Sequence, residues 1–262
     1  MHTHSTAGGN ILIDQSQIVE LEQVAANAWI AQETERLGGW LLRANGGVTR
    51  RANSVLPLGP PALPIEDAIE KVIEFYKARD LSPRFQMTDT SKPQELDNDL
   101  SERGFSVGLQ VEVHTVAINH LTKTEPEIDV LVSNDITDTW MSVYSESSGY
   151  EASTMDIRRN LMRRTTCYKA FALARIDREP AGVGFGVVDG KWLGFFNIAV
   201  HPTMRGRGVA VAVNKALAQW GHQRGARSAY LQVESENIPA LKLYDKLGFR
   251  HVYTYWYRKL DE

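Results

Sequence analysis

The second half of the chain contains short apolar runs separated by turn residues. Such runs are typical of buried or half-buried strands, because successive side chains of a strand point to opposite faces of its sheet. We expect strands over residues 128–132, 170–174, 182–188, 193–200, 229–233 and 252–258. Polar turn residues at 177–180 join two of these runs into a hairpin.

Between these strands, apolar residues recur three and four positions apart, which indicates amphipathic helices. The clearest stripe follows the strand that ends at Val200 and consists of Val209, Val213, Ala216, Leu217 and Trp220. Asp135 is expected to cap an earlier helix, whose apolar face carries Ile136, Trp140, Val143 and Tyr144. A further helix is expected to begin near Pro239, and Gly248 to end it in the left-handed conformation. This alternation predicts a mixed α/β fold.

The first half of the chain repeats the pattern of the second half. The segment 100–105 ends in Gly-Phe, as does the similar segment 244–249, and the two lie 144 residues apart. The same offset, without a gap, places the apolar stripe of residues 69–76 on that of residues 213–220. We therefore predict an α/β protein of two mixed-sheet domains in tandem. Their predicted boundaries are 15–122 and 128–262, with a break in the polar segment between them.

Composition and charge narrow the possible functions. The 262 residues carry 29 Lys and Arg against 32 Asp and Glu, so nothing indicates a nucleic-acid binder that neutralises phosphates. The single cysteine, Cys167, favours a reducing compartment. The most apolar segment, 181–200, is interrupted by charged residues and is too polar to cross a membrane. Residues 1–5 show no basic start of a secretory signal, and we expect a cytoplasmic protein that binds neither membrane nor nucleic acid.

The segment most suggestive of chemistry runs from Val200 to Ala210, between a predicted strand and the clearest helix. Gly206 and Gly208 allow a tight turn with N–H groups pointing inward, and the following helix adds partial positive charge at its start. Such a turn suits a pyrophosphate, with Arg205 and Arg207 available to pair with its oxygens. The alternative is an ordinary glycine-rich turn with solvated arginines. Neither a dinucleotide-binding fingerprint nor a P-loop occurs in this segment.

The same segment resembles the acetyl-CoA loop of the GNAT superfamily of N-acetyltransferases, whose pattern is [RQ]-x-x-G-x-[GA]. Here it reads Arg205-Gly206-Arg207-Gly208-Val209-Ala210. Residues 237–249 resemble a second motif of that family, N-x-x-A-x-x-[LF]-Y-x-[KR]-x-G-F, at the usual spacing from the first. The full resemblance covers residues 128–259, whereas the first half resembles the fold and lacks the motifs.

The resemblance implies roles for residues in and around both motifs. It implies that backbone groups of Ile198, Ala199 and Val200 bind the pantetheine arm of acetyl-CoA, and that the Val200 N–H polarises the thioester carbonyl. It also implies that Tyr244 protonates the departing thiolate, although an aromatic residue in such a helical stripe is usually part of the core. Asn237 is expected to cap its helix, to bind the cofactor, or both.

The general base is less clearly marked. Asn197 stands on the strand where relatives often carry an acid, and an amide cannot remove a proton from an ammonium group. Glu234, just past the strand of 229–233, is the best-placed candidate. Glu146 and Glu151 are further candidates, and each of the three is otherwise a solvated charge. No metal site is expected, because His2 and His4 are more typical of a chain terminus than of a ligand pair.

The first half shows no equivalent of the acetyl-CoA loop. A helix is expected over residues 18–31, and Leu109, Val111 and Val113 alternate with polar residues as in a half-buried strand. At the position equivalent to the loop, the first half carries four prolines between residues 57 and 64, and prolines lack N–H donors. Leu100 occupies the position equivalent to Tyr244 in the repeat. We expect this half to bind no CoA and to wall the acceptor cleft. The segments 40–43 and 50–53 could form part of the wall of the acceptor cleft; the alternative is that their role is purely structural.

Together these patterns predict an N-acetyltransferase that moves an acetyl group from acetyl-CoA, used as a cosubstrate, to a primary amine by direct attack. The acceptor is expected to be a small molecule or a peptide, and the sequence does not indicate which. The alternatives are a non-catalytic acyl-CoA-binding regulatory module and, third, a protein-interaction scaffold. Nothing in the sequence indicates the oligomeric state.

Overall fold

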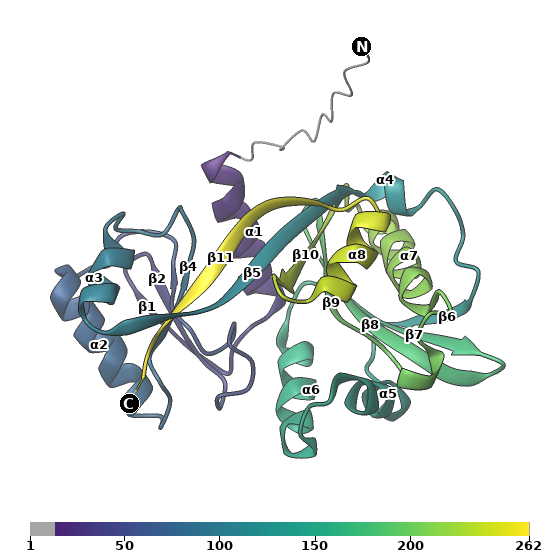
Figure 1. Cartoon of the computed structure of the whole chain (residues 1–262), viewed down its shortest axis with the longest axis horizontal. Coiled ribbons are helices and arrows are strands. Elements are labelled where there is room, and N and C mark those ends of the chain that lie inside the picture. The colour runs from purple at the N-terminus through teal and green to yellow at the C-terminus, as the bar shows by residue number, and fades with distance from the viewer. Residues whose placement is uncertain (1–13, 262) are drawn as a thin grey trace, which may run out of the picture.

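A mixed sheet runs through both halves of the protein (Figure 1). The computed structural model describes residues 14–261, and within them the sheet has eight strands in the order β4-β11-β5-β10-β9-β8-β7-β6. The strands are β4 (Arg84–Met87), β5 (Phe105–Ala117), β6 (Asp129–Ser133), β7 (Tyr168–Ile176), β8 (Glu179–Asp189), β9 (Trp192–Val200), β10 (Ser228–Glu234) and β11 (Arg250–Leu260). A smaller sheet contains β1 (Glu33–Leu37), β2 (Trp40–Ala44) and β3 (Leu56–Pro57).

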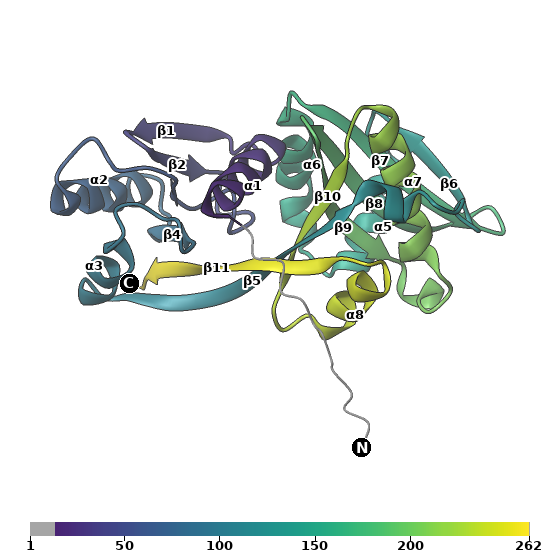
Figure 2. The same cartoon turned by 90° about the horizontal axis from the view of Figure 1, so that it is seen from above.

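The last strand of each half joins the two halves within the large sheet. β5 and β11 pair antiparallel from Thr115 and Arg250 at one end to Phe105 and Leu260 at the other. β10 flanks β5 and β4 flanks β11, so each of these long strands lies beside a strand of the other half. Figures 1 and 2 show β5 in teal and β11 in yellow running together between the two halves. The halves are therefore joined by backbone hydrogen bonds and not only by a linker.

The predicted duplication is confirmed in the elements. The offset of 144 residues places α2 (Ile65–Lys77) on α7 (Val209–Gln223), and α3 (Leu96–Glu102) on α8 (Ile238–Lys246). It also places β4 on the start of β10 and β5 on β11. The halves differ before α2 and α7, where β3 has two residues and β9 has nine. The fold is thus the predicted tandem of two mixed-sheet units with a reduced first one.

The remaining helices cover the two faces of the sheet. They are α1 (Gln15–Ala28), α4 (Ile118–Leu121), α5 (Asp138–Ser148) and α6 (Met155–Arg164), with 3₁₀ turns η1 (Ala152–Thr154) and η2 (Pro202–Met204). Large side chains such as Phe171 and Phe185 pack toward α1 and α5, and small ones such as Ala172 pack toward α7. A side chain at Gly182 would come within 2.5 Å of Val209, so glycine on β8 lets the start of α7 lie close to the sheet.

Most predicted elements are confirmed, but both ends of the first helix and the start of α5 differ. The first helix begins at Gln15 and not at residue 18. The cap of α5 is Thr137, not Asp135, because the Thr137 hydroxyl accepts the Trp140 N–H at 3.1 Å and the helix begins at Asp138. The first helix ends at Ala28 and not at residue 31, since Trp29 leaves the helical conformation. Gly248 has the predicted left-handed backbone, with φ of 86°. In the part of the chain that the structure describes, no helix combines the length and apolar character that a membrane span requires.

Candidate active site

The candidate site begins where two neighbouring strands separate. β9 and β10 pair in parallel from Trp192 and Ser228 as far as Phe195 and Leu231, and then diverge. At this point β9 carries a bulge against β8, and Asn197 takes a left-handed conformation with φ of 52°. Residues 192–196 are buried, whereas residues 197–200 are half-buried. The bulge thus opens a gap between β9 and β10 and exposes backbone that a continuous sheet would cover.

The backbone of β9 beyond the bulge has donors on the open side. The His201 N–H donates to the Ala181 carbonyl of β8 at 2.9 Å. Alternate residues of an antiparallel strand bond the same neighbour, so the N–H of Val200 points away from β8. On that side β10 has already diverged. The Val200 N–H therefore faces the gap, as do the backbone groups of Ile198, whereas those of Ala199 face β8.

The loop between β9 and α7 adds a second group of donors. Gly206 and Gly208 both have left-handed backbones, with φ of 75° and 81°, and α7 begins directly afterwards at Val209. Within residues 14–261, no acceptor takes a hydrogen bond from the N–H groups of residues 205–211. No atom lies within 4 Å of a side chain built at Gly206, so the loop is open to a ligand there. Arg205 and Arg207 are exposed, and Arg207 Nη1 donates to the Met204 sulfur at 3.2 Å.

These features fit an anionic group with several oxygens. The start of α7 contributes the positive end of its dipole, and its first N–H groups have no partner within a helix. Two left-handed glycines turn the chain so that successive N–H groups face the same side. The residues named from the sequence for the pyrophosphate, 205–210, thus lie in one open turn at the start of α7.

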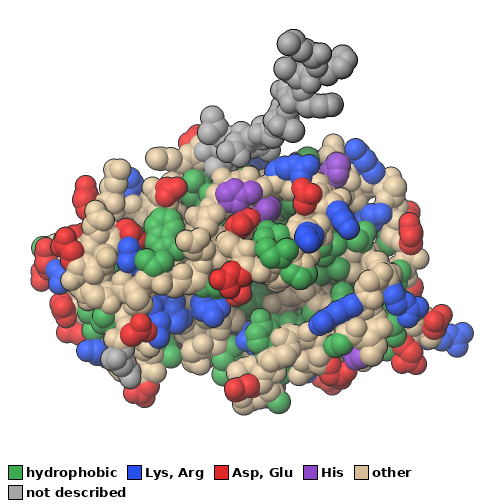
Figure 3. Space-filling model, in the orientation of Figure 1, with side chains coloured by type: hydrophobic (Ala, Val, Ile, Leu, Met, Phe, Trp, Pro, Cys, Tyr) green, Lys and Arg blue, Asp and Glu red, His purple; other side chains and the backbone are tan. Residues whose placement is uncertain are grey.

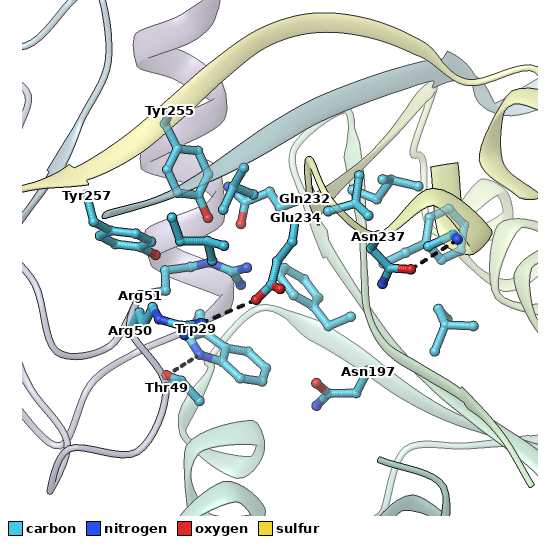
Figure 4. A pocket seen from close by; sticks show the side chains of 18 of the residues that line it. Trp29, Thr49, Arg50, Arg51, Asn197, Gln232, Glu234, Asn237, Tyr255 and Tyr257 are labelled. Carbon is cyan, nitrogen blue, oxygen red and sulfur yellow. Dashed lines mark hydrogen bonds and ion pairs between the residues drawn. The ribbon is translucent and has the colours of Figure 1, made fainter. Parts of the chain in front are cut away.

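A cavity of about 710 Å³ lies between the two halves, beside the gap. In Figure 3 this face of the molecule is hollowed between the halves, and Lys and Arg side chains border the hollow. β9, β10 and α8 line the cavity on one side, and the first half contributes Trp29, Arg50 and Arg51. β11 adds Tyr255 and Tyr257 (Figure 4). Of the residues named from the sequence, Ile198, Glu234, Asn237 and Tyr244 line this cavity, whereas Ala199, Val200 and residues 205–210 lie outside its lining.

Tyr244 lies on α8 at the edge of the cavity. It is 9% exposed and packs edge-on against Phe249, with ring centroids 5.7 Å apart. Burial raises the pKa of Tyr244 to about 12, because a phenolate would lose hydration there. The phenol is thus both part of the core and part of the cavity wall. At neutral pH it holds its proton.

The three carboxylates considered from the sequence lie in different surroundings. Glu234 lines the cavity and pairs with Arg50 across the two halves, with Oε1 and Nη1 3.2 Å apart. Both side chains are about half exposed, at 52% and 55%. Glu146 accepts from the Ser142 hydroxyl and lies 3.5 Å from His201 Nε2, and Glu151 accepts from Ser153. Neither of these two lines the cavity.

Two asparagines hold structural positions at the site. Asn237 caps α8, since its Oδ1 accepts the Ala240 N–H at 3.2 Å, and it also lines the cavity. Asn197 holds the bulge: Tyr144 donates to its Oδ1 at 3.2 Å, and its Nδ2 contacts the Met162 sulfur at 3.1 Å. The Asn197 amide is therefore oriented by the protein and carries no basic oxygen.

The first half supplies side chains that the sequence indicated only in part. Of the segments 40–43 and 50–53, Trp40 and Arg43 are buried away from the cavity, and Arg43 donates to Ser54 and Gln86. Arg50 and Arg51 line the cavity. Trp29, Arg84, Tyr255 and Tyr257 were not singled out from the sequence. The spacing of the two tyrosines, two residues apart on a strand, was the available signal that they share a face.

The equivalent positions of the first half lack the features of the loop. Pro64 precedes α2 without a side-chain cap, and Leu100 is fully buried at the position equivalent to Tyr244. Residues 14–261 contain no group of three His, Cys, Asp or Glu side chains arranged to hold a metal ion. His2 and His4 lie outside the described residues.

Comparison with known proteins identifies the family to which the chain belongs. Residues 15–258 match the family model described as "Probable histone acetyltransferase Rv0428c C-terminal". The chain is 28% identical over 245 residues to the "Uncharacterized N-acetyltransferase YobR" of Bacillus subtilis (strain 168), an alignment that covers 92% of this chain and 98% of that protein.

Solved structures share the fold at low sequence identity. A GCN5-related N-acetyltransferase from Kribbella flavida superposes with a TM-score of 0.68 at 13% identity, over 93% of this chain and 95% of that one. A tandem GNAT protein from the clavulanic acid biosynthesis pathway superposes with a TM-score of 0.60 at 12% identity, over 75% and 70% of the two chains. The chain therefore belongs to the Rv0428c C-terminal acetyltransferase family and is a tandem member of the GNAT superfamily of N-acetyltransferases.

Proposed function

We propose that the second half of the chain transfers an acetyl group from acetyl-CoA to a primary amine bound in the cavity between the halves. The observation that carries this proposal is the row of unused N–H groups from residue 205 to 211, directly beside the gap between β9 and β10. A pyrophosphate at this turn directs the rest of the cosubstrate along the open side of β9. The thioester then reaches the wall that contains Tyr244.

Acetyl-CoA supplies the activated acetyl thioester, and the protein residues position it. The N–H groups of residues 205–210 bind the pyrophosphate, with Arg205 and Arg207 as flanking charges. Backbone groups of Ile198 and Val200, on either side of Ala199, hold the pantetheine arm in place of a neighbouring strand. The N–H of Val200 donates to the carbonyl oxygen as negative charge develops on it.

Tyr244 and the acceptor complete the proton balance of the reaction. The amine nitrogen forms a bond to the acetyl carbon while the carbon–sulfur bond breaks. Tyr244 donates its proton to the leaving thiolate, and because burial raises its pKa to about 12, the phenol still carries that proton at neutral pH when the thiolate forms. The amine enters as an ammonium group and gives one proton to Glu234, directly or through water, before it attacks; Glu234 later passes this proton to solvent. The nitrogen loses its second proton as the amide forms, and that proton replaces the one that Tyr244 gave up. The ion pair with Arg50 holds the Glu234 carboxylate in the lining of the cavity.

Two other interpretations of the chain, a non-catalytic acyl-CoA-binding module and a protein-interaction scaffold, are distinguishable from this one. The description of the matching family names histone acetylation for the relative after which it is called, so the side chain of a protein lysine is one form of the proposed amine. A non-catalytic acyl-CoA-binding module would bind acetyl-CoA and acetylate no amine.

The cytoplasmic location expected from the single cysteine stays a prediction.

The test measures the release of CoA thiol from acetyl-CoA with a broad panel of primary amines. We expect amine-dependent release, and we expect Tyr244→Phe to lower kcat by about 100-fold, because general acid catalysis contributes that order of magnitude. The affinity for acetyl-CoA, measured by calorimetry, should change little. Tyr168→Phe is the matched control, since Tyr168 is 68% exposed and lies outside the cavity.

Three results would contradict parts of the proposal. Acetyl-CoA binding without release across the panel favours the non-catalytic module. No binding at all favours the scaffold. An unchanged kcat in Tyr244→Phe removes that residue from the mechanism and leaves the activity itself in place.

A further inference from the structure

The cavity between the halves has an excess of positive side chains. Arg50, Arg51, Arg84 and Arg158 line it, against one carboxylate, Glu234. Glu234 is already paired with Arg50. Among residues 14–261, the other three arginines form no ion pair. An acceptor that enters this cavity therefore meets unneutralised positive charge.

Arg51 is held by aromatic rings and not by an acid. Its guanidinium carbon lies 5.7 Å from the centroid of Trp29 and 5.6 Å from that of Phe196. Its Nε is buried without an acceptor. The buried carboxylate of Glu22 is occupied by two other donors, since Tyr253 and Gln86 each donate to it at 2.6 Å. Arg51 is thus oriented by packing and by Tyr255, and among residues 14–261 no carboxylate forms an ion pair with it.

Arg84 belongs to β4 and reaches the same cavity. Burial lowers the pKa of its guanidinium, and the nearby charge of Arg50 acts in the same direction. Burying the Arg84 guanidinium without a counter-charge is unfavourable, because it loses hydration and is repelled by Arg50. A bound anion removes both costs.

Other polar groups of this wall also lack partners. Both side-chain atoms of the Gln232 amide, Nε2 and Oε1, are buried without a hydrogen bond. Figure 4 shows the hydroxyl groups of Tyr255 and Tyr257 on the same side of the cavity as Arg51. Buried polar groups in a folded protein are normally paired with protein, water or ligand. Their gathering at one wall indicates a polar ligand at that wall.

The wall and the gap lie at different ends of the cavity. In Figure 4, Arg50 and Arg51 lie on one side of Glu234, and Asn197 and Asn237 lie on the other. Arg158 is less available than Arg51 or Arg84, because its guanidinium stacks on the Tyr150 ring at 3.4 Å and its Nε donates to Thr154. An acceptor of small size that spans the cavity would place one end at the arginines and the other near β9.

We propose that the acceptor is a small primary amine that also carries an oxyanion, a carboxylate or a phosphate, which Arg51 and Arg84 bind while the amine faces Glu234 and the gap beside β9. This inference rests on the proposed acetyl transfer. It makes the first half a specificity element, since it supplies both arginines. It also disfavours a lysine-rich peptide as acceptor, because its further positive charges would meet those of the cavity wall.

The test compares acceptors that differ in their anionic group. Each L-α-amino acid is paired with its carboxamide, and O-phosphoethanolamine is paired with ethanolamine, with acetylation followed by release of CoA thiol. We expect at least one anionic acceptor to exceed its neutral partner in kcat/KM by about tenfold or more, the effect of a charge-assisted hydrogen bond. The two arms distinguish a carboxylate from a phosphate.

Variants connect this preference to the arginines. Arg51→Gln and Arg84→Gln should each lower the ratio of kcat/KM between the partners of the preferred pair by about tenfold. Arg103→Gln is the matched control, because Arg103 is exposed at the end of α3, outside the cavity. A ratio measured on one preparation does not depend on the fraction of folded enzyme, so partial loss of stability in Arg51→Gln does not obscure the result.

The inference is overturned if each neutral partner is acetylated with the same kcat/KM as its anionic partner. It is also overturned if both variants keep the wild-type ratio of kcat/KM between the partners of the preferred pair. It is also overturned if acetyl-CoA binds and no anionic acceptor is acetylated. In each case acetylation of neutral amines leaves the proposed function standing. Failure of the proposed function is a different result, in which acetyl-CoA does not bind and no amine of either kind releases thiol.

Discussion

Single residues determine how the two halves differ at equivalent positions. Tyr244 on α8 and Leu100 on α3 stand at the same place in the repeat, and both are buried. Leu100 belongs wholly to the core of the first half, whereas the Tyr244 phenol also lines the cavity. A single hydroxyl group on an otherwise similar helix therefore separates a core position from the proposed site of proton transfer.

One ion pair between the halves gives a test at the same scale. Arg258 on β11 donates from Nε to Oδ1 of Asp97 at 2.9 Å and from Nη2 to Oδ2 at 2.6 Å, and Trp256 also donates to Oδ1. We expect Asp97→Asn to lower the free energy of unfolding at pH 7 by about 2 kcal/mol, because hydrogen bonds to a charged group are lost. Chemical denaturation of both proteins measures the difference.

The pH dependence of this effect follows from the direction of the shift. The hydrogen bond from Arg258 is the main cause that lowers the pKa of Asp97, so its stabilisation is present above about pH 4, the usual carboxyl pKa, and is lost as the pH falls through the lowered value. Asp99→Asn on the same helix is the control. Burial, followed by the charge of Glu102, raises the pKa of Asp99, so its ionisation does not stabilise the fold. Equal losses in the two variants at pH 7 would contradict this account.

Residues close together in sequence were predictable, and those brought together from afar were not. The loop of residues 205–210 and the helix that carries Tyr244 lie in continuous motifs whose spacing reflects one turn and one helix face. Arg84 and Tyr257 lie on neighbouring strands, but each stands alone in its own segment. No local pattern indicates that the tertiary fold brings them to the wall that Arg51 also lines.

At the scale of elements, β9 and α7 create the site together. The predicted strand and helix boundaries were confirmed to within about two residues because their apolar periods are clear. The bulge at Asn197 was not predicted. Asparagine tolerates left-handed backbone, but a single asparagine in an apolar run does not indicate a bulge, because pairing with β8 determines it.

Two glycines on either side of α7 allow a matched test of the loop. Gly206 and Gly225 both have left-handed backbones, with φ of 75° and 93°, and both face open space. Gly206→Ala and Gly225→Ala should therefore each lower the free energy of unfolding by about 1–2 kcal/mol, the cost of this conformation for a residue with a side chain. Only Gly206→Ala should weaken acetyl-CoA binding, by about tenfold, because its methyl group disturbs the turn that presents the N–H groups.

Calorimetric titration with acetyl-CoA checks this expectation, and thermal unfolding checks that the two variants are equally strained. If Gly225→Ala weakened acetyl-CoA binding as much as Gly206→Ala does, backbone strain anywhere near α7 would be sufficient to explain the loss of affinity. An unchanged affinity in Gly206→Ala would show that the turn does not contact the cosubstrate.

At the scale of the whole molecule, the halves exchange their last strands. β5 completes the sheet beside β10, and β11 completes it beside β4. The repeat was readable from the sequence, but this exchange was not, because an apolar period identifies a strand and leaves its neighbours undetermined. The exchange makes the first half part of the site, because this half supplies Arg51 and Arg84 to the cavity that β9 and β10 also line.

The central claim is that the second half alone binds acetyl-CoA, through the turn at the start of α7. Isothermal titration of the full chain with acetyl-CoA tests it most directly, because stoichiometry distinguishes one working half from two. We predict one acetyl-CoA per chain, with binding weakened by Gly206→Ala. Two equivalents per chain, or none, would contradict the account.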